Sequence, residues 1–369
     1  MSLDTAPLIA LAQTSADVVE HERRLTPEVA EAVTAAGFAR HFVPKQWYGS
    51  AGSFAEVAQA AAAVGEVCAS TAWCAALYAA HGRLAAHLPY EGQRDLWSHS
   101  PDVRIAAAVI PTAGEAEAVE DGWNLTGVWN LASGVDHAHW ILLSAWTGAG
   151  EARSGRIFAV PRSRFEVDHT WNSLGLRGTG SNTVHVERIF VPAHRTFTLA
   201  DLGHEEPGRE RCHRVPYQLV GAAQFVAPAL GAARRALREW AELTTARVRL
   251  DGRPAHTAAG AQEVLARASA EIHAAGLLVR HALERADLAE ITPLVVAENV
   301  RDFSMAAELC AGAVGRLMRS AGSRAQVADS PLQRRWRDVM AATAHAAVDF
   351  EAAAALYARA GFTAPGAGL

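Results

Sequence analysis

The spacing of apolar residues changes twice along the 369-residue chain. From about residue 5 to 100, apolar residues recur every three or four positions, which predicts helices. From about 105 to 200, short runs rich in β-branched and aromatic residues alternate with Gly, Asp and Pro clusters, which predicts strands and turns. Beyond Pro216 the helical period returns and continues to the end of the chain.

The pattern therefore predicts a mainly α protein with a central β domain. We expect an N-terminal helical domain over residues 1–104, a middle β domain over 105–215 and a C-terminal four-helix bundle over 216–369. Four segments predict the strands: 123–131, 140–147, 155–162 and 183–192. Several of them show the partial alternation expected of a sheet with one covered face.

Local signals place several helix boundaries. Thr26 is a residue type that caps helix N-termini, Pro27 is favoured at the first helical position, and Gly37 is favoured where a helix ends. The alanine-rich run that follows predicts helix with a break near Ala69-Ser70. In the bundle, one apolar stripe contains Leu265, Ala268, Ile272, Ala275, Val279, Ala282 and Ala286, and residues 332–361 predict one continuous last helix.

Composition and charge narrow the class of protein. Half of the residues are hydrophobic and a fifth are charged, and the net charge of −5 gives no reason to expect nucleic acid or an anionic membrane as partner. The four cysteines are scattered, which argues against a disulfide framework or a zinc site. There is no basic segment before the first apolar run and no apolar stretch of ~20 residues. We expect a soluble, cytoplasmic protein.

Candidate chemistry is confined to a few polar residues in apolar surroundings, because no Walker A loop, GxGxxG, GxSxG or HExxH motif occurs. Ser133-Gly134 interrupts an apolar run and presents a hydroxyl and an approachable backbone N–H to the edge of a flat ligand. The alternative is that Gly134 merely turns a hairpin. His137 and His139 lie two residues apart without a third ligand nearby, so we expect no metal site.

Two further histidines lie in predicted helices. Trp73 and His81 are eight residues apart, so both face one side if the helix is continuous; the alternative is a histidine satisfied in the core. His345 lies seven residues after Asp338 and four before Asp349, so all three share one face of a continuous helix. A carboxylate partner would raise the histidine pKa and suit a general base, whereas the alternative is a solvated polar stripe.

The domain order resembles the acyl-CoA dehydrogenase superfamily, which has an N-terminal helical domain, a middle β-barrel or sandwich and a C-terminal four-helix bundle. Gly127 to Ser133 resembles that family's GxKxxIT segment, and Ser133 stands where its threonine touches the flavin near N5. Residues 174–192 resemble the segment that ends the β domain. "RVRLDG", from Arg247, resembles the arginine segment that reaches a flavin in a neighbouring subunit.

Departures from the dehydrogenases favour another branch of the fold. Residues 108–117 lack the Thr-Glu and Gly-Ser-Asp of the dehydrogenase motif, and the glutamate base has no match. The motifs instead resemble two-component flavin-dependent monooxygenases, a group with p-hydroxyphenylacetate hydroxylase, steroid-degradation phenol hydroxylase, dibenzothiophene oxygenase and amino-sugar N-oxygenases. The matching motifs are Ser70 to Trp73 with His81, Trp129 to Gly134, and Arg337-Asp338 with His345.

The resemblance implies reduced FMN or FAD supplied by a separate reductase, which reacts with O2 to a C4a-hydroperoxide that oxidises a small molecule. It implies catalytic roles for His345, Ser133 and His81, and a substrate pocket with Trp73, His81 and His345. The residues expected to contact the flavin are Ser133, Gly134, Leu131, Trp73, Val109 and Arg247. By analogy with the fold we expect a homotetramer.

The substrate stays open at this point. An aromatic compound or other secondary metabolite is expected, with N-oxygenation of an amine or amino sugar as the competing reaction. An acyl-CoA dehydrogenase and a non-catalytic binding protein on the same fold are the further alternatives.

Overall fold

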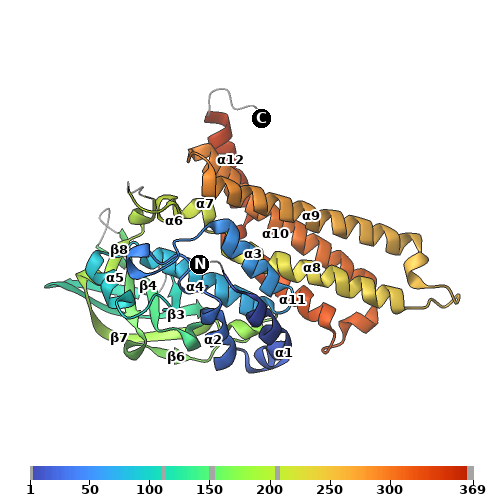
Figure 1. The fold of residues 1–369 in the computed structure, drawn as a ribbon, viewed down its shortest axis with the longest axis horizontal. Helices are drawn as coiled ribbons and strands as arrows, with labels where there is room; N and C mark the ends of the chain where they lie inside the picture. Colours follow the sequence, from blue (N-terminus) through green and yellow to red (C-terminus); the bar gives the residue numbers. More distant parts are fainter. Residues whose placement is uncertain (1–2, 110–113, 149–153, 204–207, 364–369) are drawn as a thin grey trace. The chain divides into compact units, whose positions relative to one another are not determined.

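The computed structural model describes residues 3–109, 114–148, 154–203 and 208–363 (Figure 1). The chain forms two compact units. Unit 1 comprises Met1–Val57, Cys74–Asn172 and Arg177–Tyr217. Unit 2 comprises Ala58–Trp73, Ser173–Leu176 and Gln218–Leu369. Within the described ranges, no helix combines the length and the hydropathy that a membrane crossing requires.

The N-terminal helices follow the boundary signals of the sequence. They are α1 (Ala6–Glu22), α2 (Pro27–Ala35), α3 (Phe54–Gly65), α4 (Ala69–Ala85) and α5 (Tyr90–Trp97). The Thr26 side chain accepts a hydrogen bond from the Val29 N–H, with Pro27 in the first turn, and Gly37 has φ +94°. These features confirm the predicted cap and stop. The break between α3 and α4 also lies where the sequence predicts it.

The strands of unit 1 form one mixed sheet. They are β1 (Ile105–Ala108), β2 (Gly114–Val119), β3 (Gly122–Ala132), β4 (Trp140–Thr147), β5 (Ser154–Pro161), β6 (Glu166–Asp168), β7 (Asn182–Pro192) and β8 (Thr196–Thr198). Their order is β6-β7-β3-β2-β4-β5-β8, and β1 pairs in parallel with β4. The four predicted strands correspond to β3, β4, β5 and β7, and the sequence pattern missed the other four.

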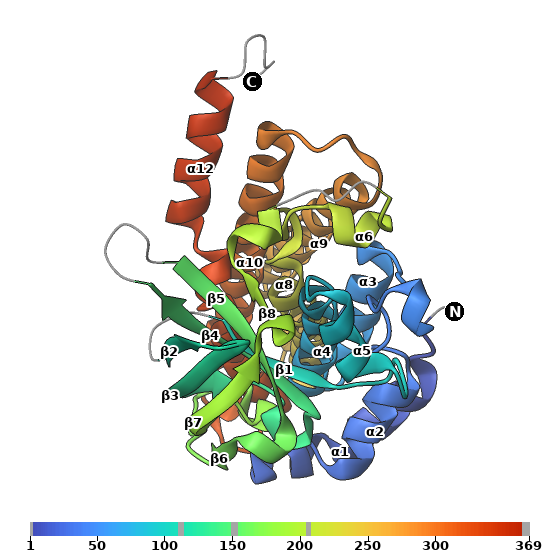
Figure 2. The same ribbon diagram turned by 90° about the vertical axis from the view of Figure 1, so that its left-hand side faces the viewer.

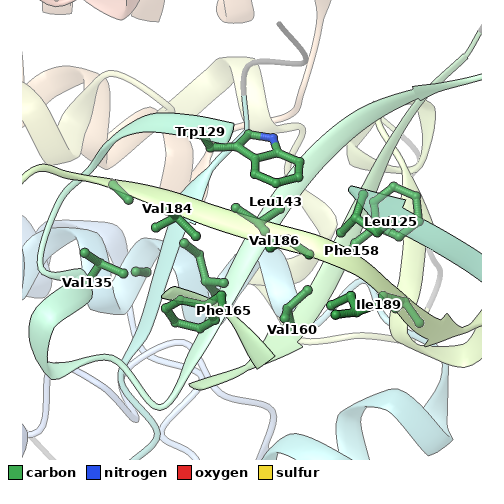
Figure 3. Packing of buried hydrophobic residues seen from close by; sticks show 14 of the residues in the cluster. Leu125, Trp129, Val135, Leu143, Phe158, Val160, Phe165, Val184, Val186 and Ile189 are labelled. Atoms are coloured by element: carbon green, nitrogen blue, oxygen red, sulfur yellow. The ribbon is translucent and has the colours of Figure 1, made fainter. Parts of the chain in front are cut away.

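Two apolar clusters lie on opposite sides of the central strands. The first, shown in Figure 3, gathers Leu125, Leu143, Phe158 and Val184 from strands β3, β4, β5 and β7. The second contains Leu142 and Ile157 together with residues of α4 and α5. Neighbours in sequence alternate between the clusters, so β4 and β5 are covered on both faces. The expectation of one covered face is therefore wrong for these two strands.

Unit 2 is a helical bundle (Figures 1 and 2). Its long helices are α8 (Ala223–Ala246), α9 (Ala259–Leu288), α10 (Pro293–Ala321), α11 (Pro331–Thr343) and α12 (Phe350–Thr363). α8 packs against α9, α10 and α11, whereas α12 packs against α10. The predicted stripe of α9 is buried, except for Leu265, which is exposed.

The predicted last helix is not continuous. α11 ends at Thr343, and a short 3-10 turn, η10 (Ala346–Val348), separates it from α12. The His345 side chain caps η10, and the Asp349 carboxylate accepts a hydrogen bond from the Ala352 N–H at the start of α12. These two side chains satisfy backbone donors that a continuous helix would have satisfied itself.

Candidate functional site

The Ser133-Gly134 pair forms a corner of unit 1 rather than a hairpin turn. β3 ends at Ala132, and Gly134 adopts a left-handed φ of +70° before the 3-10 turn η2 (Val135–His137). β3 pairs with β2 and β7 and not with β4, the next strand in the chain. The hairpin reading of Gly134 is therefore wrong.

The backbone of the corner is held at three points. The Ser133 N–H donates to the Leu131 carbonyl at 3.1 Å, and the Gly134 N–H donates to the Thr179 carbonyl at 2.8 Å. The hydroxyl of the fully buried Tyr78 donates to the Gly134 carbonyl at 2.6 Å. A Cβ on Gly134 would lie 2.7 Å from that hydroxyl, so the close approach of Tyr78 requires glycine as much as the dihedral angle does.

The Ser133 side chain begins a chain of hydroxyl groups. Its Oγ lies 2.7 Å from Ser181 Oγ, which lies 2.7 Å from Thr179 Oγ1. All three side chains are buried. The loop that precedes β7 therefore supplies both a carbonyl for Gly134 and a hydroxyl for Ser133.

Leu131 projects from a bulge immediately before the corner. The β3–β7 register shifts between Trp129 and Ala132, so that Asn130 and Leu131 together oppose one residue of β7. Leu131 has φ +64°, and its side chain is 65% exposed. An exposed apolar side chain therefore lies two residues before the buried Ser133 in the chain. Val109 is partly buried beside the second apolar cluster, and residues 110–113 of the same segment lie outside the described residues.

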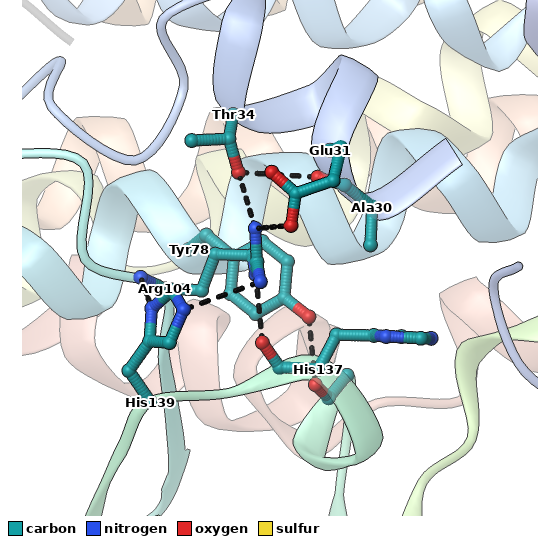
Figure 4. Close-up of polar contacts among 8 residues, drawn as sticks. Ala30, Glu31, Thr34, Tyr78, Arg104, His137 and His139 are labelled. Carbon is teal, nitrogen blue, oxygen red and sulfur yellow. Dashed lines mark hydrogen bonds and ion pairs between the residues drawn. The ribbon is translucent and has the colours of Figure 1, made fainter. Parts of the chain in front are cut away.

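Arg104 ties residues 135–139, the stretch between β3 and β4, to the helices (Figure 4). Its guanidinium bonds Glu31 Oε1 at 2.9 Å, Thr34 Oγ1 at 2.8 Å and the His137 carbonyl at 2.7 Å. The Arg104 N–H donates to His139 Nδ1 at 3.1 Å. Burial and the Arg104 charge lower the pKa of His139.

The two histidines of this stretch are engaged in structural contacts. His137 Nε2 donates to the Leu25 carbonyl at 2.7 Å, and His139 Nδ1 accepts from the Arg104 N–H. In the part of the chain that the structure describes, no group of three metal-ligating side chains occurs. These histidines fix the path between β3 and β4.

His81 of unit 1 is a neutral acceptor. Its Nδ1 lies 2.8 Å from the Ile105 carbonyl, which can only accept, so Nδ1 carries the proton and Nε2 keeps its lone pair. Burial lowers the pKa of His81 to about 4. His81 therefore stays uncharged near neutral pH. α4 is continuous from Trp73 to His81, as the sequence predicts.

His345 of unit 2 lies among aromatic rings. It stacks on Phe225 at 3.8 Å between ring centroids, and Trp73 contacts it edge-on at 6.0 Å. Trp73 and Phe225 also contact each other, at 5.0 Å. His345 Nδ1 accepts from the Ala347 N–H at 3.1 Å, so the neutral ring carries its proton on Nε2. His345 Nε2 is therefore a hydrogen-bond donor, whereas His81 Nε2 is an acceptor.

The predicted carboxylate partners of His345 are wrong. Because α11 ends at Thr343, Asp338 and Asp349 do not share a helical face with His345. Asp338 Oδ1 instead accepts from the Leu176 N–H at 2.7 Å, and Asp349 caps α12. Burial lowers the pKa of His345, whereas a carboxylate partner would have raised it.

The Arg337-Asp338 pair fastens a short loop. Arg337 Nη1 donates to the Leu174 carbonyl at 2.6 Å, and the Asp338 carboxylate accepts a hydrogen bond from the Leu176 N–H. Between them, a Cβ on Gly175 would collide with the Arg337 carbonyl. This motif therefore has a structural role within unit 2.

Arg247 lies at the C-terminal end of α8, where an exposed turn begins. Its Nη1 contacts the Ala321 carbonyl at 3.4 Å. Val248 pairs with Pro254, and the Leu250 side chain is fully exposed.

The sequence analysis missed four residues that contact Gly134, Ser133 or His345 directly or through another hydroxyl: Tyr78, Thr179, Ser181 and Phe225. Only Thr179 and Ser181 carried a signal, because two hydroxyls flank a glycine before a strand.

Comparisons with known proteins cover nearly the whole chain. Residues 223–350 match the family model "Acyl-CoA dehydrogenase, C-terminal domain". The chain is 32% identical over 371 residues to the flavin-dependent monooxygenase, oxygenase subunit HsaA, of Rhodococcus jostii (strain RHA1), covering 95% of each chain. It is 30% identical to the FADH(2)-dependent resorcinol hydroxylase, oxygenase component, of Rhizobium sp. (strain MTP-10005), covering 93% of this chain and 89% of that one.

A crystal structure of similar fold supports the match. The 3-HSA hydroxylase from Rhodococcus sp. RHA1 superimposes with a TM-score of 0.89 and 29% sequence identity, covering 97% of this chain and 95% of that chain. The similarity therefore extends over the helices and the sheet together.

Proposed function

This chain belongs to the oxygenase components of two-component flavin-dependent monooxygenases built on the acyl-CoA dehydrogenase fold, and we propose that it hydroxylates a phenol beside a flavin bound at Ser133. Such an oxygenase takes reduced flavin from a reductase and acts on aromatic substrates. The bound reduced flavin supplies the electrons that activate O2 for transfer of one oxygen atom. The side chains of the protein would bind the flavin, bind the substrate and form hydrogen bonds to the reacting groups.

The Ser133 corner fits a flat heteroaromatic ring edge, and this observation carries the proposal. The exposed Leu131 lies near the end of β3, and the buried Ser133 hydroxyl and Gly134 come directly after the strand. The hydroxyl suits a ring nitrogen, and Leu131 suits an apolar ring face. Ser133 would bind the flavin near N5, with Gly134, Leu131 and Val109 along its edge and Trp73 near the ring system.

His81 favours a phenol as substrate. Its Nδ1 proton is committed to the Ile105 carbonyl, so Nε2 is an acceptor. The buried, neutral Nε2 atom can accept a hydrogen bond from a phenol hydroxyl. As Nε2 begins to remove the hydroxyl proton, electron density on the phenol ring increases. An ammonium substrate would place a charge beside a buried histidine without a carboxylate partner among the described residues.

His345 would act as a hydrogen-bond donor. Its Nε2–H is fixed by the Ala347 bond, and its ring orientation is fixed by Phe225. We therefore assign His345 a hydrogen bond from Nε2–H to an oxygen atom of the reacting groups, instead of the base role that a carboxylate partner would have supported. Arg247, on its exposed turn, would contact a flavin phosphate of a neighbouring subunit in a homotetramer.

The test is single-turnover oxidation of the reduced complex. Anaerobic protein with FMNH2, and separately with FADH2, is mixed with oxygenated buffer containing resorcinol or another phenol. Hydroxylated product and hydrogen peroxide are both quantified. We expect product formation with at least one phenol and peroxide as the minor outcome. Flavin oxidation at the rate of free flavin, with stoichiometric peroxide for every phenol, would refute the proposal.

A further inference from the structure

We propose that Arg104 is a positioning residue for the hydroxylation, because it fixes where the His81 imidazole lies relative to the Ser133-Gly134 corner. The inference rests on the proposed function, in which Ser133 binds the flavin and His81 binds the phenol. No motif in the sequence assigned a role to Arg104. The contacts that support the inference all lie within unit 1 (Figure 4).

Arg104 is bonded to the turn that follows the corner. Its Nε donates to the His137 carbonyl at 2.7 Å, and the His137 N–H donates to the Gly134 carbonyl at 3.3 Å. Its Nη1 donates to Glu31 Oε1 and Thr34 Oγ1 of α2, which fixes the rotation of the planar guanidinium. The Arg104 side chain is buried, so water does not replace a bond that is lost.

The residue after Arg104 holds His81. The Ile105 carbonyl accepts a hydrogen bond from His81 Nδ1 at 2.8 Å, which leaves Nε2 as the acceptor for a phenol hydroxyl. Two backbone bonds fix the same point of the chain, because the Arg104 N–H donates to His139 Nδ1 and the Arg104 carbonyl accepts the His139 N–H at 2.8 Å. Arg104 and Ile105 therefore connect His81 to the segment that leaves the corner.

A further contact closes these bonds into a ring. Tyr78 precedes His81 by three residues on α4, and its hydroxyl donates to the Gly134 carbonyl at 2.6 Å. The ring contains, in order, Gly134, His137, Arg104, Ile105, His81 and Tyr78. A closed ring of bonds restricts the separation between its members more than an open chain does. Oxygen transfer depends on that separation, since a displacement of about 1 Å can lower a rate about 100-fold.

Opening the ring at Arg104 should therefore affect oxygen transfer more than binding. Ser133 and His81 keep their own side chains in such a variant, so the flavin and the phenol each retain their contacts. The placement of one relative to the other changes instead. A phenol that is misplaced beside the flavin leaves the activated oxygen to be released as hydrogen peroxide.

Two substitutions separate the bond between Arg104 and His137 from the other contacts of the guanidinium. In Arg104→Gln the amide nitrogen stands as many bonds from the backbone as Nε does, so it can still donate to the His137 carbonyl. Arg104→Met reaches as far but has no donor. Both variants lose the bonds from Nη1 to α2. Asp102→Asn is the matched control, because Asp102 bonds Arg40 from the same segment and is not a member of the ring.

The experiment is single-turnover oxidation of each reduced complex at saturating flavin and saturating resorcinol, or another phenol that the wild type hydroxylates. Hydroxylated product and hydrogen peroxide are quantified, and anaerobic titration gives the dissociation constants of reduced flavin and of the phenol. Melting of the flavin-free proteins tests folding. If Arg104→Met does not fold, Tyr78→Phe opens the ring at its other link and should lower the ratio of product to peroxide likewise.

We expect Arg104→Met to lower the ratio of product to peroxide about tenfold, while both dissociation constants stay within about threefold of the wild-type values. Arg104→Gln should recover most of the ratio, and Asp102→Asn should keep it. An unchanged ratio in Arg104→Met, or an equal loss in Arg104→Gln or Asp102→Asn, would overturn the inference alone. A wild type that forms no hydroxylated product would overturn the proposed function, and the inference with it.

Discussion

The close packing of Tyr78 on Gly134 predicts a specific coupling between two substitutions. Gly134→Ala places a methyl group 2.7 Å from the Tyr78 hydroxyl and forces alanine to φ +70°. Tyr78→Phe removes the hydroxyl, and with it the 2.6 Å bond to the Gly134 carbonyl. Because both changes abolish the same hydrogen bond, their effects on the free energy of unfolding should not add.

The magnitudes follow from the two separate costs. An alanine in the left-handed region costs about 1–2 kcal/mol. Loss of a buried hydrogen bond costs about 1–3 kcal/mol. Gly134→Ala alone should therefore destabilise the protein by about 2–5 kcal/mol, and Tyr78→Phe alone by about 1–3 kcal/mol. The double variant should be more stable than the sum of the single effects predicts by about 1–3 kcal/mol, because the bond is lost only once.

The assay is urea unfolding of the flavin-free proteins, followed by far-ultraviolet circular dichroism at neutral pH. Midpoint and slope are both fitted, so that a change in the slope is not mistaken for a change in stability. Gly203→Ala is a suitable control, since a Cβ there meets nothing within 4 Å. Additive effects within about 0.5 kcal/mol would show that the Tyr78–Gly134 bond does not hold the corner.

Three further outcomes are expected. Ser133→Ala should lower the yield of hydroxylated product and raise that of hydrogen peroxide, because a hydrogen bond of about 1–3 kcal/mol is lost. An unchanged ratio of product to peroxide would contradict the role of Ser133. Because the pKa of His81 is lowered to about 4 by burial, its contribution to stability is complete above pH ~6.5 and is lost, by roughly 3 kcal/mol, as the pH falls toward 4. His81→Leu should flatten the melting temperature over that range, and an unaltered pH dependence would refute this. Asp338→Ala should destabilise unit 2 by about 1–3 kcal/mol through loss of the Leu176 N–H bond, measured by calorimetry against Asp349→Ala, which removes only an exposed cap.

Most of the secondary structure was predictable because it depends on residues near one another in the chain. Thr26 caps α2 through the Val29 N–H three residues later, and the apolar stripe of α9 is buried at the helical period. The four strands with longer apolar runs were predicted, whereas β1, β2, β6 and β8 are short or polar and depend on their neighbours for hydrogen bonds.

The last helix shows where local pattern misleads. Residues 332–361 are rich in alanine and have high helix propensity, so the sequence predicts no interruption. Propensity is a weak preference per residue, and side chains that cap backbone donors can override it. The break at Thr343 separates His345 from Asp338 and gives that histidine Ala347 and Phe225 as neighbours instead.

By itself the sequence determined the order of the helical and β regions, the family and the residue types available for chemistry. Only the tertiary structure decided the state of those residues, because their partners come from distant parts of the chain. Ile105 selects the proton position of His81, and Ser181 provides the hydroxyl beside Ser133. Hydrogen-bond polarity belongs to a pair of groups, and neither member of such a pair specifies it alone.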